Sequence, residues 1–288
     1  MNEKRKEIIV KNDDTLISIL SNNLQDLSLK TIKNYVRHKM CEINGVTETN
    51  YNKIIKKDSI IVLYFSERII NNYNIDIIYE DKDLIAINKP SGLLSISNSK
   101  EKNITAFRMV SDYIKKDNPK AKLFVIHRLD QDTSGVLIFS KNLKLKEKMQ
   151  KSWNEIVKKR EYICVVRGKT PQSGQIESYL TMNHFQIVHS TKNKEIGKLA
   201  ITNYEMIKYK KPYSLLKVNI ETGRRNQIRA HLSEMGYPIV GDKKYGSKVN
   251  PIGRLALHAT ELDLIDIRNG KILKIKTKIP EEIEKIVS

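Results

Sequence analysis

From residue 75 onward the chain is built mainly from short apolar segments of the β type, and this pattern limits its possible folds more than any other feature. The segments predicted as strands are 76–79, 84–88, 135–140, 162–166, 200–207, 214–220 and 262–267. Helical periodicity is restricted to the segments 105–116, 142–155 and 225–235. Strands that follow one another with only occasional helices favour an α+β fold with a mixed, mostly antiparallel central sheet and flanking helices, not a doubly wound sheet.

The first part of the chain has a different organisation. Apolar stripes at helical spacing consist of Leu16, Ile19 and Leu20 and of Ile32, Tyr35 and Val36. The dipeptide Asn44-Gly45 predicts a tight hairpin, because both positions of such a turn need positive φ. A strand at 59–65 follows, and the polar stretch 66–74 has the composition of a linker. We therefore predict a small α/β module over residues 1–70 and a larger domain over residues 71–288.

The chain is strongly basic, with 52 Lys and Arg against 33 Asp and Glu and a formal charge of +19. A surplus of this size is typical of proteins that bind polyanions, because cations placed on phosphates release counterions. The excess is +3 in residues 1–70 and +16 in the remainder, where it is densest at 141–169 and 207–231. We interpret the surplus as a sign of nucleic-acid binding, and the alternative is a solvated, solubilising surface.

Two groups of basic side chains share helix faces suited to phosphate. The candidate RNA-binding residues are Lys33 and Arg37 in the small module and Lys144, Lys148 and Lys151 in the larger domain. The second group lies opposite an apolar stripe, as charged side chains on the outer face of a surface helix usually do.

The sequence lacks the motifs that mark several common classes of protein. Neither a dinucleotide-binding glycine motif nor a phosphate loop is present, and the six histidines are scattered without a carboxylate at metal-ligand spacing. Cys41 and Cys164 are far apart and form no metal motif. No apolar stretch reaches the roughly 20 residues that a bilayer requires, and the polar start suggests no export. We expect a cytoplasmic monomer with no cofactor, no metal and no membrane partner.

One polar turn is the best candidate for chemistry. In the segment 124–138, two apolar runs flank a turn that contains Arg128, Asp130 and Asp132. Taken alone, this arrangement is compatible with a structural ion pair. It is also compatible with a catalytic aspartate, which needs no cofactor if a nearby cation keeps it ionised.

This segment and five others resemble the RluA-type pseudouridine synthases. The first is His127-Arg128-Leu129-Asp130 with Thr133-Ser134-Gly135, which is similar to that family's catalytic motif. The others, in the family's order, are Asn88 to Leu93, Arg160 to Gly168, Thr222 to Leu232, and Gly236 to Asp242 with Tyr245-Gly246, followed by Leu255 to Ala259. The match extends over nearly all of 75–265. The front module is similar to the small RNA-binding domain named after the fourth small-subunit ribosomal protein.

The resemblance implies a basic cleft across the sheet and isomerisation of uridine to pseudouridine in RNA, with base flipping. It places Asp130 as the catalytic aspartate, Arg229 as the arginine paired with it, and Tyr162 as the ring against the flipped uracil. The substrate-binding residues that it implies are Arg128, which fills the vacated position in the stack, Leu257, which closes the pocket, and Lys89, Arg225 and Asn226. His127 is expected to orient the loop.

The target and the rival functions follow from the same comparison. A front RNA-binding module favours large-subunit ribosomal RNA as the substrate, with transfer RNA second. The rivals are a non-catalytic RNA-binding or ribosome-assembly factor and an aspartate-using hydrolase that releases uracil. This chain differs from the usual family pattern at Asn226, Arg160 and Cys164, where His, Lys and Ala are common. Asn226 is the difference most relevant to RNA contact.

Overall fold

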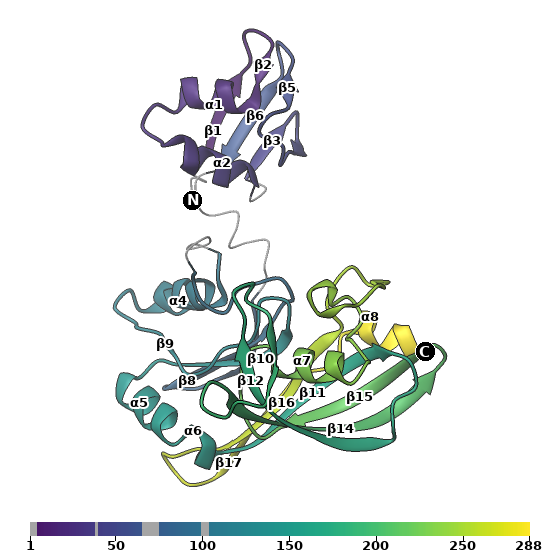
Figure 1. Ribbon diagram of the computed structural model, residues 1–288. Coiled ribbons are helices and arrows are strands. Elements are labelled where there is room, and N and C mark those ends of the chain that lie inside the picture. The colour runs from purple at the N-terminus through teal and green to yellow at the C-terminus, as the bar shows by residue number, and fades with distance from the viewer. Residues whose placement is uncertain (1–4, 38–39, 65–74, 99–103) are drawn as a thin grey trace. The chain divides into compact units, whose positions relative to one another are not determined.

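The computed structural model describes residues 5–37, 40–64, 75–98 and 104–288 (Figure 1). The chain divides into two compact units, Met1–Asn74 and Ile75–Ser288. The predicted boundary at residue 70, and the predicted linker at 66–74, lie outside the described residues. Each unit has its own apolar core.

The first unit is a small α/β module. Its elements are β1 (Arg5–Ile9), β2 (Asp14–Thr15), α1 (Leu16–Asn23), α2 (Leu29–Arg37), β3 (Cys41–Ile43), β4 (Val46–Thr47), β5 (Ile54–Ile55) and β6 (Ile60–Tyr64). The strands form a sheet in the order β1-β6-β3-β4 and a separate β2-β5 pair. The predicted hairpin is confirmed, because Asn44 and Gly45 have φ of 50° and 81° and Ile43 pairs with Val46. The two helical stripes are buried in this module's core.

The second unit contains one large sheet. Its strands are β7 (Asp76–Glu80), β8 (Leu84–Lys89), β9 (Phe124–Val125), β10 (Ser134–Ser140), β11 (Val157–Arg167), β12 (Ser173–Met182), β13 (Val188–Thr191), β14 (Lys198–Lys210), β15 (Tyr213–Ile220), β16 (Leu257–Ile265) and β17 (Ile272–Lys276). The order is β13-β12-β14-β15-β11-β16-β10-β8-β7, with β17 on β16 and β9 on β10. Only β10 and β16 pair in parallel among these described strands, so the expected mixed, mostly antiparallel sheet is confirmed.

Helices cover both faces of the part of the sheet that contains β8 and β10 (Figure 1). The helical elements of the unit are α4 (Ala106–Asp117), α5 (Leu143–Lys151), α6 (Trp153–Ile156), α7 (Gln227–Glu234), η1 (Lys243–Tyr245), α8 (Glu281–Glu284) and η2 (Lys285–Val287). Leu137 and Phe139 of β10 pack in the core beneath α4, whereas Val136 and Ile138 pack with α5. Because successive side chains point to opposite faces, a strand covered on both sides must be apolar throughout. This explains the continuous run in β10.

The start of β10 requires a glycine. Gly135 has a φ of 114°, and a Cβ atom there would lie 2.1 Å from the carbonyl oxygen of Ala259. The residue pairs with Ala259 on the neighbouring parallel strand. A side chain would therefore push β10 away from β16 immediately after the turn that contains Asp130.

The structure also contains strands that the sequence analysis did not predict. These are β1, β2 and β5 in the first unit and β9, β12, β13 and β17 in the second, and several predicted strands are longer than expected. Much of β12 is exposed, so its apolar alternation is weak. The predicted helix at 142–155 is interrupted at Ser152, which ends α5 and precedes α6.

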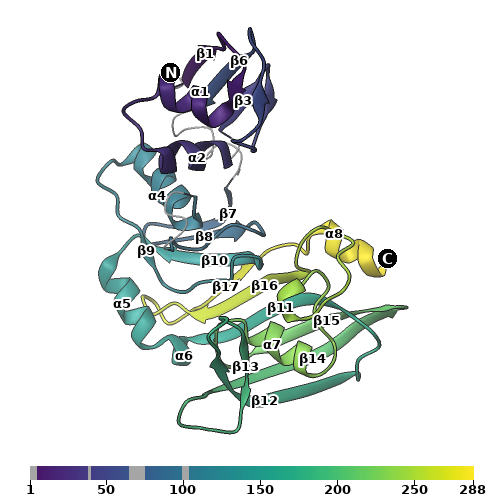
Figure 2. The ribbon, with the colours of Figure 1, turned by 45° about the horizontal axis from the view of Figure 1, so that its top comes forward.

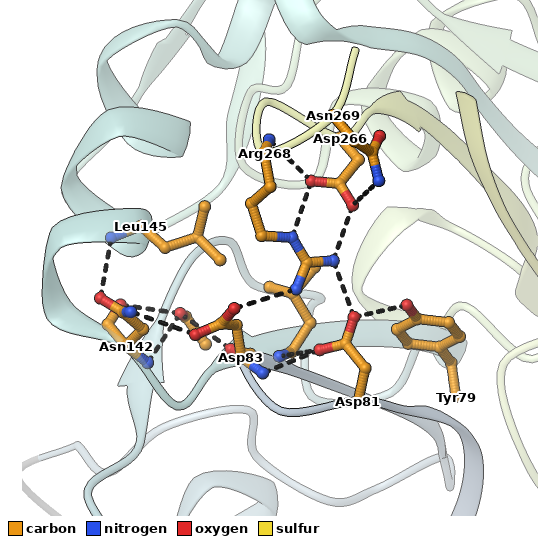
Figure 3. A network of polar contacts seen from close by, with 10 residues as sticks. Tyr79, Asp81, Asp83, Asn142, Leu145, Asp266, Arg268 and Asn269 are labelled. Carbon is orange, nitrogen blue, oxygen red and sulfur yellow. Dashed lines mark hydrogen bonds and ion pairs between the residues drawn. The ribbon is translucent and has the colours of Figure 1, made fainter. Parts of the chain in front are cut away.

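A polar cluster around Arg268 joins three turns at the edge of this unit (Figure 3). The guanidinium contacts Asp266 at 2.7 Å, Asp81 at 2.7 Å and Asp83 at 3.2 Å. Asn142, which caps α5 by accepting from the Leu145 amide, also donates to Asp83 at 3.1 Å. The cluster therefore links the β7–β8 turn, the β16–β17 turn and the start of α5.

Candidate functional site

Asp130 lies in a pocket of about 520 Å³ in the second unit. The lining comes from the loop before β10, from α5 and α6, from β11, from the end of β15, from the first turn of α7 with the segment before it, and from the start of β16. Among the described residues that line it are six that the sequence analysis expected to be catalytic or to bind substrate: Arg128, Asp130, Tyr162, Asn226, Arg229 and Leu257. The lining includes four arginines, Arg128, Arg160, Arg224 and Arg229, against the single carboxylate of Asp130. The pocket therefore suits an anionic or polar ligand.

The segment after β8 fastens the Asp130 loop in place. The Ser95 hydroxyl donates to the Leu129 carbonyl at 2.8 Å and accepts from the Leu129 amide at 3.1 Å. The Gly92 amide donates to the Gln131 carbonyl at 3.0 Å. The Ser91 hydroxyl donates to the Asp132 carbonyl at 2.6 Å. These bonds fix the backbone on both sides of Asp130.

Lys89 belongs to this fastening and not to the pocket surface, which corrects its expected role in substrate binding. The side chain is 0% exposed, and its ammonium donates to the carbonyls of Pro90, Leu93 and Gln131 at 2.6–2.9 Å. All three protons are thus used inside the protein. Burial lowers the pKa of Lys89 to about 7, although the nearby Asp132 and Asp130 oppose this shift.

The Asp130 carboxylate is half-buried and has an electrostatic environment of mixed sign. Burial raises its pKa above the ordinary value of 3.8. Four cations oppose the rise, in decreasing order Arg229, Arg128, Arg225 and Lys89. None of the lysines and arginines in the described ranges lies close enough to Asp130 to form an ion pair. The carboxylate therefore faces the pocket without a direct partner.

Arg229 forms its ion pair with Asp242, which corrects the expected direct pair with Asp130. Its Nε and Nη2 donate to the two Asp242 oxygens at 2.7 and 2.8 Å, and its Nη1 donates to Asn226 at 3.3 Å. The guanidinium also lies 5.0 Å from the Tyr245 ring centre. Because both Arg229 and Asp242 are buried, this bidentate pair fixes the orientation of the arginine. Arg229 acts on Asp130 through space.

Sequence reasoning assigned no role to Asp242, although the residue lies in a quoted motif. The sequence did hold a clue to this residue, because an arginine on the buried side of a helix needs a carboxylate partner. Asp242 is such a carboxylate in a short Gly-Asp turn, and it also accepts from the Tyr245 amide at 3.2 Å.

Tyr162 and Leu257 come from neighbouring strands that meet at the pocket. Tyr162 on β11 pairs with Ala259 on β16, two residues after Leu257. Burial raises the pKa of the Tyr162 hydroxyl to about 12, so the hydroxyl stays protonated near neutral pH. Leu257 is 2% exposed. Arg128 lines the pocket and is exposed.

The segment before α7 carries two of the residues expected to bind substrate, Asn226 and Arg225. Asn226 is 6% exposed, adopts a left-handed φ of 51°, and donates to the Tyr245 hydroxyl at 3.2 Å. Its amide is thus used inside the protein, but Asn226 also lines the pocket, so its expected part in substrate binding stays a prediction. Arg225 is exposed, lies outside the pocket lining, and donates to Gln186 at 3.0 Å.

His127 and Arg160 are two further polar residues in the lining of the pocket. His127 accepts from the Ile138 amide at 3.2 Å and stacks on Trp153 with ring centres 5.2 Å apart. Burial, together with Arg160, lowers its pKa to about 4, so it is neutral near pH 7. This agrees with an orienting role. Arg160 donates to the Glu221 carbonyl, but its Nε is buried without a hydrogen-bond partner.

The five candidate RNA-binding cations lie on helix surfaces. Lys144, Lys148 and Lys151 are exposed on α5, whose Leu145 and Met149 are buried on the opposite side. In the first unit, Lys33 and Arg37 on α2 each lie 5.1 Å from the centre of the Tyr51 ring. Arg37 also donates to the Tyr51 hydroxyl at 3.1 Å.

The part of the chain that the structure describes contains no group of three or more His, Cys, Asp or Glu side chains arranged to bind a metal ion. Cys41 and Cys164 are free and buried, and burial raises the pKa of the Cys41 thiol to about 12. Within the same residues, no helix is long and apolar enough to cross a membrane.

Comparison with protein families identifies similar sequences over most of the chain. A family model described as RNA pseudouridylate synthase matches residues 83–234. The chain is 27% identical to an uncharacterised RNA pseudouridine synthase of Bacillus subtilis (strain 168), over 99% of this chain and 98% of the relative. It is 29% identical to ribosomal large subunit pseudouridine synthase D of Borreliella burgdorferi, over 96% and 90%. It is 33% identical to tRNA pseudouridine synthase C of Haemophilus ducreyi, over 64% and 83%.

Solved structures share the fold. The structure titled human RNA pseudouridylate synthase domain containing 4 matches with a TM-score of 0.60 and 22% identity, over 73% of this chain and 90% of that chain. Human RNA pseudouridylate synthase domain containing 1 matches with a TM-score of 0.59 and 22% identity, over 71% and 83%.

Proposed function

The chain belongs to the RNA pseudouridylate synthase family and is an RNA pseudouridine synthase, and from this premise we propose that Asp130 isomerises a uridine of structured RNA without a cofactor. The observation that carries the proposal is a half-buried carboxylate with no direct ion-pair partner among the described residues, in a pocket lined by four arginines. The arginines attract phosphate, and their field favours the ionised form of Asp130.

The reaction rearranges one nucleotide and releases nothing. The target uridine leaves its stack and enters the pocket, which costs a few kcal/mol that contacts with the enzyme offset. Asp130 then either adds to the uracil ring or assists elimination at the sugar. By either route the bond from nitrogen 1 to the sugar breaks, the base turns, and carbon 5 forms the new bond to the sugar. Carbon 5 then gives up its proton and nitrogen 1 takes one up, so the composition of the RNA does not change.

Each neighbouring residue has a place in this proposal. Arg128 at the exposed rim occupies the position that the uridine leaves, where its flat guanidinium stacks on a base and meets phosphate. The Tyr162 ring lies against the uracil, and its protonated hydroxyl lies near carbon 5. Leu257 closes the floor. Arg160, whose Nε has no partner, is a further donor for phosphate or a uracil carbonyl.

For the substrate we propose large-subunit ribosomal RNA, with transfer RNA as the second candidate. Relatives named for both kinds of RNA match this chain. The match to the ribosomal enzyme covers 96% of the chain and so includes the first unit, whereas the match to the transfer-RNA enzyme covers 64%. This difference favours the ribosomal target. Mapping pseudouridines in total RNA from cells with and without the gene identifies the site.

Asp130→Asn tests the catalytic assignment. The amide keeps the shape of the carboxylate and removes its charge, so RNA affinity should stay within about threefold while the single-turnover rate falls more than 100-fold, about 2.7 kcal/mol in barrier. Mass spectrometry provides the product control, since pseudouridine formation leaves the RNA mass unchanged. Release of free uracil by the wild-type protein would indicate a hydrolase. If the wild-type protein binds the RNA but forms no pseudouridine, it is a non-catalytic factor. A variant that retains more than a hundredth of the rate contradicts the assignment.

A further inference from the structure

Two aromatic rings are exposed at the turn between β12 and β13, which we call the β12–β13 tip (residues 182–187). Phe185 is 70% exposed, and its ring centre lies 3.8 Å from that of His184. Met182 at the end of β12 is 44% exposed. A single exposed apolar residue needs no explanation, but adjacent rings and a thioether at one turn form a local apolar surface.

Hydrogen bonds hold the tip in a defined turn. The Asn183 amide donates to the Ile187 carbonyl at 3.0 Å, and the Ile187 amide donates back to the Asn183 side chain at 3.0 Å. The Gln186 amide donates to the Asn183 carbonyl at 2.9 Å, and Gln186 has a left-handed φ of 61°. These bonds use Asn183, Gln186 and Ile187. The turn makes no demand for a phenylalanine at position 185, so its ring is free to serve another purpose.

The tip is anchored to the segments that build the Asp130 pocket. Arg225 donates to Gln186 at 3.0 Å and contacts the Met182 sulfur at 3.3 Å. Lys244 donates to the Gln186 carbonyl at 2.7 Å. Figure 2 shows β12 and β13 beside α7, and the Val188 amide donates to the Tyr245 hydroxyl at 3.0 Å. Both Arg225 and Lys244 interact electrostatically with Asp130. The tip that carries the rings is therefore bound to two cations whose charges act on Asp130.

We propose that the β12–β13 tip is a stacking platform on which Phe185 and His184 bind an unpaired RNA base that flanks the target uridine. This inference rests on the proposed function, and it adds a contact for a second nucleotide. When the target leaves its stack, neighbouring bases lose a stacking partner, and a ring on a rigid support can replace it. The cations of Arg225 and Lys244 beside the rings complement RNA phosphate and disfavour a basic protein partner.

The test uses a short stem-loop that contains the mapped target uridine, with 2-aminopurine replacing the flanking base on each side in turn. With wild-type enzyme, stacking should quench the fluorescence of one of the two probes. Phe185→Ala should abolish the quenching and weaken affinity roughly tenfold. Phe185→Trp should restore both, because it keeps an aromatic face. The single-turnover rate at saturating RNA should change less than twofold, since Phe185 touches no reacting atom. Ile272→Ala, at a residue 58% exposed on β17, is the matched control.

An abasic residue at the flanking position separates stacking from other effects. On that RNA, Phe185→Ala should cost no further affinity, because the base that it contacts is missing. Three results would overturn the platform: unchanged quenching and affinity in an active Phe185→Ala enzyme, an equal loss on the abasic RNA, or a change in self-association without a change in RNA affinity. If wild-type enzyme forms no pseudouridine in the same samples, the proposed function fails and the platform fails with it.

Discussion

At the scale of single residues, Arg229 lies between two carboxylates in different environments. Asp242 binds it through two hydrogen bonds at 2.7 and 2.8 Å, whereas Asp130 feels only its field. A bidentate pair between buried groups restricts the guanidinium to one orientation. Arg229 is therefore a fixed source of positive potential at the pocket, and Asp242 is the residue that positions it.

This arrangement predicts opposite pH effects for two substitutions. Arg229→Met removes the cation that most opposes the rise in the Asp130 pKa, so that pKa rises further and the acidic limb of kcat/KM moves to higher pH. Most of the activity at neutral pH should be lost. Asp242→Asn removes the negative charge that offsets Arg229 and leaves the cation, so the pKa of Asp130 should fall and the limb should move to lower pH. Rates measured from pH 4 to 8 compare the two.

A stability control accompanies these rates. Arg229→Met leaves the Asp242 carboxylate buried without a cation, which should cost about 3–5 kcal/mol of the free energy of unfolding. Urea unfolding checks that each variant is folded under the assay conditions. If the acidic limb of kcat/KM moves in the same direction for both substitutions, the charges of Arg229 and Asp242 do not set the pKa of Asp130 as proposed.

At the scale of elements, the loop that contains Asp130 is positioned by strands that cannot shift easily. β8 and β10 are covered on both faces, and Gly135 lets β10 approach Ala259 on β16. The segment after β8 then binds the loop through Lys89, Ser91 and Ser95. The central sheet thus holds the backbone at Asp130 in a fixed position.

The Arg268 cluster in Figure 3 should stabilise the edge of the sheet. Arg268→Met leaves Asp81, Asp83 and Asp266 close together without their shared cation, and we expect a loss of about 2 kcal/mol in the free energy of unfolding. Although burial alone would raise the pKa of Asp81, hydrogen bonds from Arg268 and Tyr79 lower it below 3.8. A lowered carboxylate pKa gives stability that is present above the ordinary pKa and lost as the pH falls below it. The difference from wild type should therefore shrink below about pH 4.

Arg108→Met is the matched control for this prediction. Arg108 pairs with Asp112 four residues later on α4, and its side chain is 62% exposed. Exposed pairs of this type contribute about 0.5 kcal/mol or less. Urea unfolding of both variants decides the matter, and equal losses would show that the Arg268 cluster contributes no more than a surface pair.

At the scale of the whole molecule, the two units have separate cores and unequal charge. We propose that the first unit anchors RNA. Residues 75–288 alone should fold and modify a short stem-loop at a rate within about threefold of the full chain. They should bind large RNA more weakly and with a shallower salt dependence, because each phosphate that the first unit no longer neutralises reduces the log-log slope by about 0.7–0.9.

Lys33→Ala with Arg37→Ala in the full chain gives a finer version of the same experiment. Both cations stack on Tyr51, so the double variant removes charge from one defined surface. Filter binding from low to high salt measures the slope. A slope equal to that of the intact chain, in both the truncated and the double variant, would mean that this face is an ordinary solvated surface.

The sequence alone was sufficient to predict much of this protein. The period-2 and period-3.6 patterns predicted the α+β class, the buried strands β8 and β10, and the helices α4 and α5. The Asn44-Gly45 turn was also predicted, because its φ requirements are local. The motifs located Asp130, Tyr162 and Arg229, which the fold then brings to one pocket. These features depend on local backbone preference and on the burial of one face, which the order of residues encodes directly.

Only the tertiary structure decided which buried polar groups meet. The pairing of Arg229 with Asp242, the burial of Lys89 beneath the Asp130 loop and the internal use of Asn226 depend on loops that are distant in the chain. The bond between Gln186 of the β12–β13 tip and Arg225 has the same origin. A buried charge must find a partner, but periodicity does not say which one, because the partner is fixed by the packing of the elements that carry the loops.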